Sequence, residues 1–200
     1  MTDLSATIRT SSRFQPPWTI SVPLIGKGVL GGVLYGLLGI FSYTLPGTED
    51  ITIRPAIAIL VFLGIRFGPL VGGLAGLIGN PIVDLFQGDN VLVFWDWHLA
   101  NALIGALAGV VAFYFREPEG PKVRAVRLAV ISIISLVFGF ALTFLDLLRG
   151  VGAYAWWSDA YLPAVGWSIL VCVVLVPLLD SGWRPKSDAA PKAAAAKDAH

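Results

Sequence analysis

The segment from Phe94 to Asn101 concentrates polar and aromatic groups in a chain that is otherwise strongly apolar. It reads FWDWHLAN and carries Trp95, Asp96, Trp97, His98 and Asn101. Flat aromatic faces beside hydrogen-bonding groups suit the binding of a small planar ligand. Tryptophan also collects in belts at membrane interfaces, so a belt is the alternative explanation for the same residues.

Two further segments lead small residues up to a carboxylate at helical spacing. They carry Gly72, Gly76, Asn80 and Asp84 in one case, and Ser135, Gly139, Thr143 and Asp146 in the other. Residues at these spacings share one face of a helix. Small residues let membrane helices approach closely, whereas a charged Asp at the bilayer centre costs about 2.5 to 3.5 kcal/mol and needs a partner or a watered cavity. Asp84 could serve a binding site or a bond between helices, and Asp146 is better interpreted as a solvated or salt-bridged rim residue beside Arg149.

The polar residues do not form a catalytic or metal-binding set. Only His98 and His200 are present, Cys172 is the single cysteine, and no HExxH, GxSxG or Walker A pattern occurs. An intramembrane dyad of Ser135 with a histidine is formally possible but has no supporting motif. Asp96 and His98 stand two residues apart, which disfavours a metal pair on one helix face. The sequence therefore predicts no enzyme, no metal, no cofactor and no ATP hydrolysis by this chain.

The composition indicates that membrane helices position these side chains. Of the 200 residues, 56% are hydrophobic and 14% are charged, against about 25% charged in a soluble domain. A bilayer-spanning helix needs about 20 apolar residues, and such runs occupy 23–45, 69–88, 98–115, 128–148 and 160–180, with a shorter one at 55–67. The net charge of +1 leaves no basic patch for a nucleic acid.

We therefore expect an all-α integral membrane protein of six helices. The expected domains are a cytoplasmic N-terminal segment at 1–22, a membrane domain at 23–181 and a disordered cytoplasmic tail at 182–200, rich in Ala, Pro and Lys. With both termini inside, all 14 basic residues except Arg54 and Arg149 fall on the inner side, as the positive-inside rule requires. The polar ends of the helix faces described above then meet at the outer side.

Several segments of the chain resemble the substrate-specific S components of energy-coupling factor (ECF) vitamin transporters. The motifs that carry the resemblance are TEDITIRPAI at 48–57, FGPLVGGLAGLIG at 67–79 with Asp84 five residues further on, and WDWHLAN at 95–101. The pattern is most similar to the branch that includes hydroxymethylpyrimidine and pyridoxine carriers. Relatives often have GH where this chain has Asn80 and Pro81. The resemblance covers roughly residues 26–115, and the last two helices by hydropathy alone.

The resemblance implies a fold, a cargo and partners. The fold is an S-component bundle with six transmembrane helices and both termini inside. The cargo is a small planar vitamin or precursor, pyrimidine- or pyridoxine-like, captured from outside and delivered inward with a transmembrane coupling subunit and two ATPase subunits supplied in trans. The loop 47–54 would gate the pocket, and the lining would be Glu49, Asn80, Asp84, Trp95, Asp96, Trp97, His98, Asn101, Asp146, Trp156 and Trp157.

The first helix carries glycines at the spacing with which this family docks on its coupling subunit, namely Gly28, Gly32 and Gly36. Packing within the bundle would explain these glycines equally well. Two other functions also remain open. A membrane scaffold or assembly subunit would bind no ligand, and a solitary carrier or channel would need no ATPase. We expect the chain to be a multi-pass protein of the cytoplasmic membrane of a prokaryote.

Overall fold

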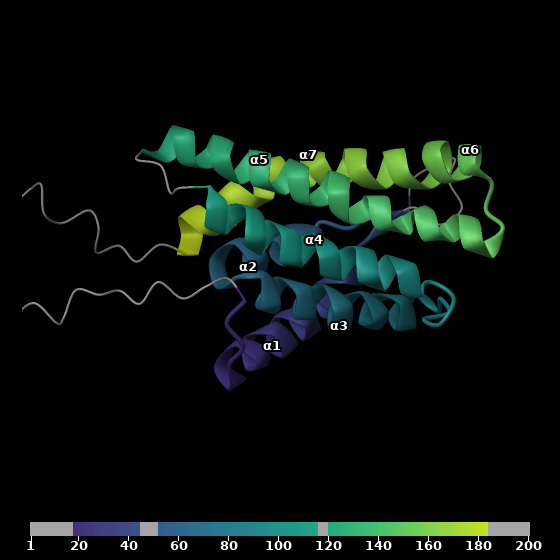
Figure 1. Ribbon diagram of the computed structural model, residues 1–200, viewed down its shortest axis with the longest axis horizontal. Coiled ribbons are helices and arrows are strands. Elements are labelled where there is room, and N and C mark those ends of the chain that lie inside the picture. The colour runs from purple at the N-terminus through teal and green to yellow at the C-terminus, as the bar shows by residue number, and fades with distance from the viewer. Residues whose placement is uncertain (1–17, 45–51, 116–119, 184–200) are drawn as a thin grey trace, which may run out of the picture.

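The fold is a bundle of helices that lie side by side along one long axis (Figure 1). The computed structural model describes residues 18–44, 52–115 and 120–183. The elements are α1 (Val22–Gly39), β1 (Tyr43–Thr44), β2 (Thr52–Ile53), α2 (Ile57–Phe67), α3 (Pro69–Gln87), α4 (Trp95–Tyr114), α5 (Pro121–Phe140), η1 (Ala141–Arg149), α6 (Ala153–Ala155), η2 (Trp156–Tyr161) and α7 (Leu162–Trp183). The 3-10 helix η1 continues α5, and the π-helix η2 joins α6 to α7.

The described helices agree with an all-α membrane protein. Five of them are long and apolar enough to cross a bilayer, with α5 and η1 counted as one and α6, η2 and α7 as another. The remaining helix, α2, has 11 residues and is apolar but short. The prediction of an all-α membrane fold is thereby confirmed.

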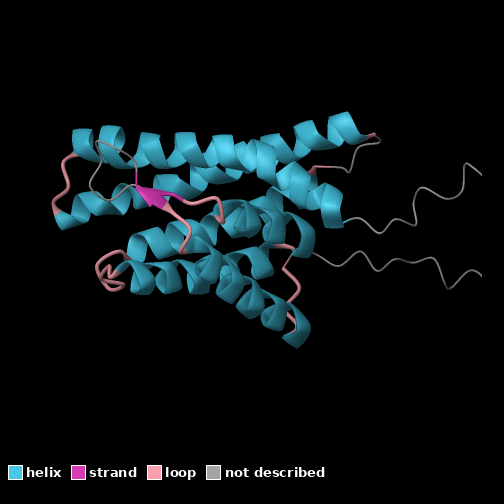
Figure 2. Ribbon diagram, turned by 180° about the vertical axis from the view of Figure 1, so that it is seen from behind, coloured by secondary structure: helices cyan, strands magenta, loops and turns pink. Residues whose placement is uncertain are grey.

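The observed helix boundaries differ from those predicted by hydropathy at the start of α5 and at the end of α1. The fifth helix begins at Pro121 rather than at 128, because Pro121 occupies a favoured first helical position and the basic first turns that follow carry no apolar signal. The first helix ends at Gly39 rather than at 45, since the chain turns there toward β1. The short antiparallel pair β1–β2 was not predicted (Figure 2).

Glycines bring the backbones of α2, α3 and α4 into direct contact. A Cβ added at Gly72 would lie 2.7 Å from the Cα of Gly64, and one at Gly76 would lie 2.6 Å from the backbone nitrogen of Ala102. No side chain larger than hydrogen fits at these crossings. Close backbone approach is the usual way in which membrane helices pack, and here it fixes α3 and α4, which carry much of the site, against each other.

The glycines Gly28, Gly32 and Gly36 of α1 face α3. An added Cβ at these positions would meet Leu74, Ile78 and Ile82 respectively, at 2.9 Å or less. The face that they form is therefore filled by α3 in this conformation. This placement favours the alternative of packing within the bundle over that of a free docking surface.

The bundle has two chemically different ends. The start of α1 and the end of α7 lie at the same end (Figure 1), which we call the basic end because the described part of the chain there contains Lys27, Arg66, Lys122, Arg124 and Arg127. The β1–β2 pair and the connections 88–94 and 150–152 lie at the opposite end (Figures 1 and 2). Arg54 and Arg149 lie there, and we call this the cavity end.

Candidate functional site

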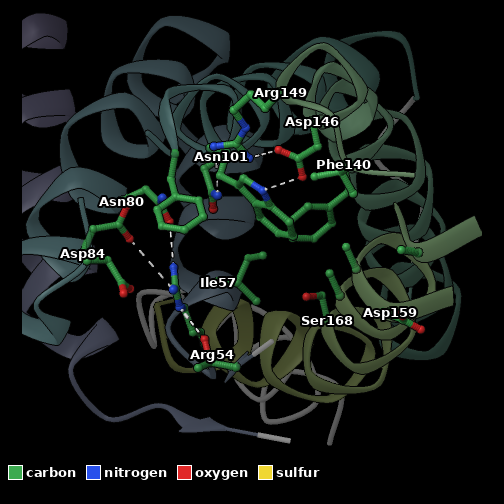
Figure 3. A pocket seen from close by; sticks show the side chains of 18 of the residues that line it. Arg54, Ile57, Asn80, Asp84, Asn101, Phe140, Asp146, Arg149, Asp159 and Ser168 are labelled. Atoms are coloured by element: carbon green, nitrogen blue, oxygen red, sulfur yellow. Dashed lines mark hydrogen bonds and ion pairs between the residues drawn. The ribbon is translucent and has the colours of Figure 1, made fainter. Parts of the chain in front are cut away.

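A cavity of about 540 Å³ lies at the cavity end between α2, α3, α4, the α5–η1 helix and the α6–η2–α7 helix (Figure 3). This volume falls within the range of about 300 to 1,000 Å³ that is typical of small-molecule sites. The lining residues are Tyr35, Thr52, Arg54, Ile57, Asn80, Asp84, Asp89, Phe94, Trp97, Asn101, Phe140, Asp146, Arg149, Val151, Ala155, Asp159, Ala160, Ala164 and Ser168.

Arg54, which follows β2, holds one wall of the cavity together. Its Nε donates to Thr52 Oγ1 at 2.8 Å, Nη1 donates to Asn80 Oδ1 at 2.8 Å, and Nη2 donates to Gln87 Oε1 at 3.0 Å. Gln87 in turn donates to Ser42 Oγ at 2.6 Å. The guanidinium therefore links β2, α3 and the segment after α1, while its side chain remains 20% exposed.

Asp84 supplies the negative charge behind this wall. Its Oδ1 lies 3.9 Å from Arg54 Nη2, and its Oδ2 lies 3.6 Å from His98 Nε2. Oδ2 is buried and accepts no hydrogen bond from the described part of the chain. Because buried carboxylate oxygens are normally hydrogen-bonded, Asp84 retains unused acceptor capacity at the cavity wall.

Asn101 and Tyr35 form a polar floor beside Asp84. The Tyr35 hydroxyl donates to Asn101 Oδ1 at 2.8 Å, and Asn101 Nδ2 donates to the carbonyl oxygen of Trp97 at 2.9 Å. An amide nitrogen carries two hydrogens, so one N–H of Asn101 is not used by these contacts. Asn101 is held rigidly and still offers a donor to the cavity.

The opposite wall is a second charged cluster centred on Arg149 (Figure 3). Its guanidinium contacts the Asp146 carboxylate and the carbonyl oxygen of Val93, and lies 3.5 Å from Asp96 Oδ1. It also lies over the Phe94 ring, 5.3 Å from the centroid. Asp96 is 1% exposed and accepts no hydrogen bond from the described residues, so it acts as a counter-charge behind the cavity.

Trp97 provides the largest aromatic surface between the two clusters. Its indole Nε1 donates to Asp146 Oδ2 at 3.2 Å, and its ring packs edge to face on Phe140 with 6.0 Å between centroids. Across the cavity, α6, η2 and α7 present small side chains, namely Ala155, Ala160, Ala164 and Ser168. The hydrogen bond fixes the plane of the indole, and the small residues leave space in front of it.

The structure brings only part of the predicted site to the cavity. The predicted residues that line it are Asn80, Asp84, Trp97, Asn101 and Asp146. His98 and Asp96 are buried behind the wall. Trp95 is exposed outside it. Glu49 lies outside the described residues.

Trp156 and Trp157 also lie outside the lining. Trp156 donates to Thr143 Oγ1 at 3.1 Å, and Trp157 stacks on Tyr161 with 5.3 Å between centroids. The two tryptophans therefore contact η1 and η2 and do not line the cavity. For Asp146, the salt bridge to Arg149 is present, but the side chain is buried rather than solvated.

Arg54 and Arg149 line the cavity but were not among the predicted lining residues. Arg54 belongs to the loop 47–54 that is expected to gate the pocket, and Arg149 is the expected partner of Asp146. They are also the two basic residues that fall on the outer side, as exceptions to the positive-inside rule. Their position on the outer side was the available signal, because a basic residue there needs a local partner such as a carboxylate, and each of the two has one. Tyr35, Phe140 and Ser168 gave no signal, since each lies within a long, predominantly apolar run of sequence.

Acidic groups outnumber basic groups in the lining. Among the described lining residues, the ionisable ones are Arg54 and Arg149 against Asp84, Asp89, Asp146 and Asp159, which gives a formal charge of +2 − 4 = −2. Each arginine already faces a carboxylate. The cavity therefore favours a neutral or cationic guest over an anion.

A membrane-spanning helical bundle with a chamber of polar and aromatic side chains at one end defines a membrane protein that binds a small molecule within its bundle. The family model of the ECF-type riboflavin transporter, S component, matches residues 27–175. The chain belongs to this family. It is thus a substrate-binding component of an ECF transporter, located in the cytoplasmic membrane of a prokaryote as a multi-pass protein, and not an enzyme.

A curated relative gives a consistent result. A UPF0397 protein of Vibrio atlanticus (strain LGP32) is 28% identical over 158 residues, which cover 76% of this chain and 86% of the relative. No solved structure gives a significant match. The prediction of an ECF S component is confirmed, whereas the narrower likeness to hydroxymethylpyrimidine and pyridoxine carriers stays a prediction.

Proposed function

We propose that the cavity captures one neutral, planar nitrogen heterocycle from outside the cell, and that this guest is a flavin such as riboflavin. The observation that carries the proposal is the cavity of about 540 Å³ between two fixed arginine clusters, with Trp97 as its aromatic wall. The family model that matches the chain is named for a riboflavin transporter. A guest with three fused rings and a polyol chain uses a chamber of this size better than a single-ring vitamin does.

The ring system of the guest would lie against Trp97. The indole is held by Asp146 and Phe140, so it loses little freedom when a second ring stacks on it. Such aromatic pairs contribute about 0.5 to 1.5 kcal/mol beyond the burial of their area. The small side chains of α6, η2 and α7 leave room for the opposite face of the ring.

The polar edge of the ring would lie against Arg54, Asp84 and Asn101. The guanidinium has five N–H groups, and three hydrogen bonds to described residues leave donors for ring carbonyls. Asn101 offers one further N–H, and Asp84 an acceptor for a ring N–H. Alternating carbonyl and N–H groups on one edge are what a flavin presents.

A single-ring pyrimidine or pyridoxine-like guest is the second candidate. The lining charge of −2 favours it where the ring carries an amino group or a protonated nitrogen. Such a ring could occupy the corner between Asp84, Asn101 and Trp97. It would leave the Asp146–Arg149 side of the cavity to water.

The cavity end would face outside. Among the described residues, Lys27, Arg66, Arg124 and Arg127 gather at the opposite end, which the positive-inside rule assigns to the cytoplasm. A coupling subunit and two ATPase subunits would then be met at the basic end, and delivery of the guest would need them. A scaffold without cargo would have no use for a chamber of this size.

Titration of the purified protein decides between these candidates. We expect riboflavin to quench or shift Trp fluorescence with a dissociation constant below about 1 μM, which corresponds to about 8 kcal/mol, and its phosphate ester to bind more weakly because the lining is acidic. Tight binding of pyridoxine or an aminopyrimidine, with none of riboflavin, would establish the second candidate. Absence of binding by all of them would favour the scaffold.

A further inference from the structure

We propose that the basic end contains a binding site for the phosphodiester headgroup of an anionic membrane lipid. A second cavity of about 340 Å³ lies there, at the junction of α2 and α3, the end of α4, the start of α5 and the end of α7. Its charged lining residues are Arg66, Arg124, Arg127 and Asp180. Three guanidiniums against one carboxylate give the described lining of this cavity a formal charge of +3 − 1 = +2. This charge is opposite in sign to that of the described lining at the cavity end.

The three arginines differ in how far they are already engaged. Arg124 is bound to Asp180 through Nε at 2.6 Å and Nη2 at 2.8 Å. Arg127 donates to the carbonyl oxygens of Ala112 and Phe115 at the end of α4 through Nε and Nη2, which leaves Nη1 without a bond in the described part of the chain. Arg66 is exposed and makes no hydrogen bond or ion pair with a described residue. Arg66 and Nη1 of Arg127 therefore remain available for an anion.

The first turn of α3 adds donors to the same cavity. The helix begins after Gly68, no side chain of a described residue caps it, and Leu70 lies in the cavity lining. The first N–H groups of a helix lack intrahelical partners and carry partial positive charge, which favours phosphate groups. The Arg66 guanidinium, Nη1 of Arg127 and a helix N-terminus thus lie around one cavity.

The position of the cavity selects a lipid rather than a soluble anion. Its rim contains Phe67 and Phe113, on which Trp183 and Trp18 pack with centroid distances of 5.8 and 6.4 Å. Both tryptophans are more than half exposed, as is usual for anchors at the level of the headgroups. Basic pockets between helices on the cytoplasmic side are suited to anionic headgroups, and the apolar residues Leu24 and Ile65 of the lining suit the glycerol and upper acyl chain.

Native mass spectrometry of the full chain in detergent tests the proposal. We expect the wild-type chain to retain one molecule of phosphatidylglycerol and not phosphatidylcholine. Arg66→Gln should weaken retention about fivefold, the effect of one cation near a lipid headgroup, and Arg66→Lys should restore most of it. Lys122→Gln is the matched control, because Lys122 is exposed at the same end but does not line the cavity. Size-exclusion profiles confirm that each variant is folded.

Several outcomes would overturn the proposal. If Lys122→Gln weakens lipid retention as much as Arg66→Gln does, the effect comes from the overall charge of this end and not from the cavity. If phosphatidylcholine is retained as well as phosphatidylglycerol, the site does not select an anionic headgroup. Displacement of the lipid by millimolar inorganic phosphate would indicate a site for a free anion. If Arg66→Gln retains the lipid but fails to assemble with a coupling subunit, the cavity is a protein interface instead.

Discussion

Asn80 on α3 and His98 on α4 are joined by a hydrogen bond of 2.9 Å that fixes the orientation of both side chains. His98 Nε2 lies 2.9 Å from the carbonyl oxygen of Val91, which can only accept, so Nε2 carries the hydrogen and Nδ1 accepts from Asn80 Nδ2. Asn80 Oδ1 is then free to accept from Arg54. The imidazole thus determines, through one amide, where the guanidinium of the cavity wall is held.

Replacement of His98 by Phe should destabilise the protein and loosen Arg54. The change leaves the Asn80 N–H and the Val91 carbonyl without partners, at a cost of about 1 to 3 kcal/mol. Thermal unfolding in detergent, followed by Trp fluorescence, measures the loss. His98→Gln keeps one donor and one acceptor and should lose less. Equal unfolding temperatures of both variants and wild type would show that the hydrogen bonds of His98 to Asn80 and Val91 do not contribute to stability.

Replacement of Trp97 by Ala should weaken binding of the vitamin by about tenfold, because the stacking partner is lost. Trp97→Phe keeps an aromatic ring but loses the hydrogen bond to Asp146, so its affinity should be intermediate. Titration with riboflavin measures both. Trp95→Phe is the control, since Trp95 is exposed outside the cavity. An unchanged affinity in Trp97→Ala would remove this residue from the site.

Replacement of Gly72 by Ala should separate α3 from α2 and α4. The added methyl group would lie 2.6 Å from the backbone carbon of Gly105 and 2.7 Å from the Cα of Gly64, and backbone atoms cannot give way by rotation. Overpacking of this kind costs about 1 to 3 kcal/mol. The next residue is a matched control, because a Cβ at Gly73 would make only ordinary contact with Ala106 at 3.5 Å. Comparable unfolding temperatures of the two variants would contradict the backbone contact.

Replacement of Gly36 by Ala distinguishes the two interpretations of the α1 glycines. An added Cβ would lie 2.6 Å from Ile82 Cβ, so the isolated chain should unfold at a lower temperature. Gly26→Ala is the control, because nothing lies within 4 Å of its added Cβ. Unchanged stability of Gly36→Ala, together with failure to bind a coupling subunit in a pull-down, would instead assign these glycines to docking.

Hydropathy was sufficient to predict the helices, because a bilayer imposes the same length and composition on every span. It failed at the start of α5, where Lys122, Arg124 and Arg127 extend the helix beyond the apolar core. It also missed the β1–β2 pair, whose two-residue strands are too short to show alternation. The start of α5 has a local signal in Pro121, which hydropathy does not register, whereas the strand pair depends on the two segments meeting.

The site was predicted where a polar residue interrupted an apolar helix face, as at Asn80, Asp84 and Asn101. The same rule predicted too many lining residues, because a buried polar residue can lie behind the lining of a cavity, as Asp96 and His98 do. The sequence stripes did mark real helix contacts, and the amides are indeed bonded to neighbouring helices. A chamber nevertheless lies between them, which an explanation by helix packing alone does not require.

Ser42, Gln87 and Arg54 form a continuous line of hydrogen bonds from the segment after α1, across the end of α3, to the residue after β2. A chimera that exchanges the N-terminal third of this chain for that of a relative would cut this line between residues 54 and 87. The transplanted arginine at position 54 would then form its hydrogen bond only if the recipient chain also has a glutamine at position 87. Chimeras should therefore acquire the substrate preference of the donor relative when residues 42, 54 and 87 all come from that relative. They should fail to do so when these residues come from different chains.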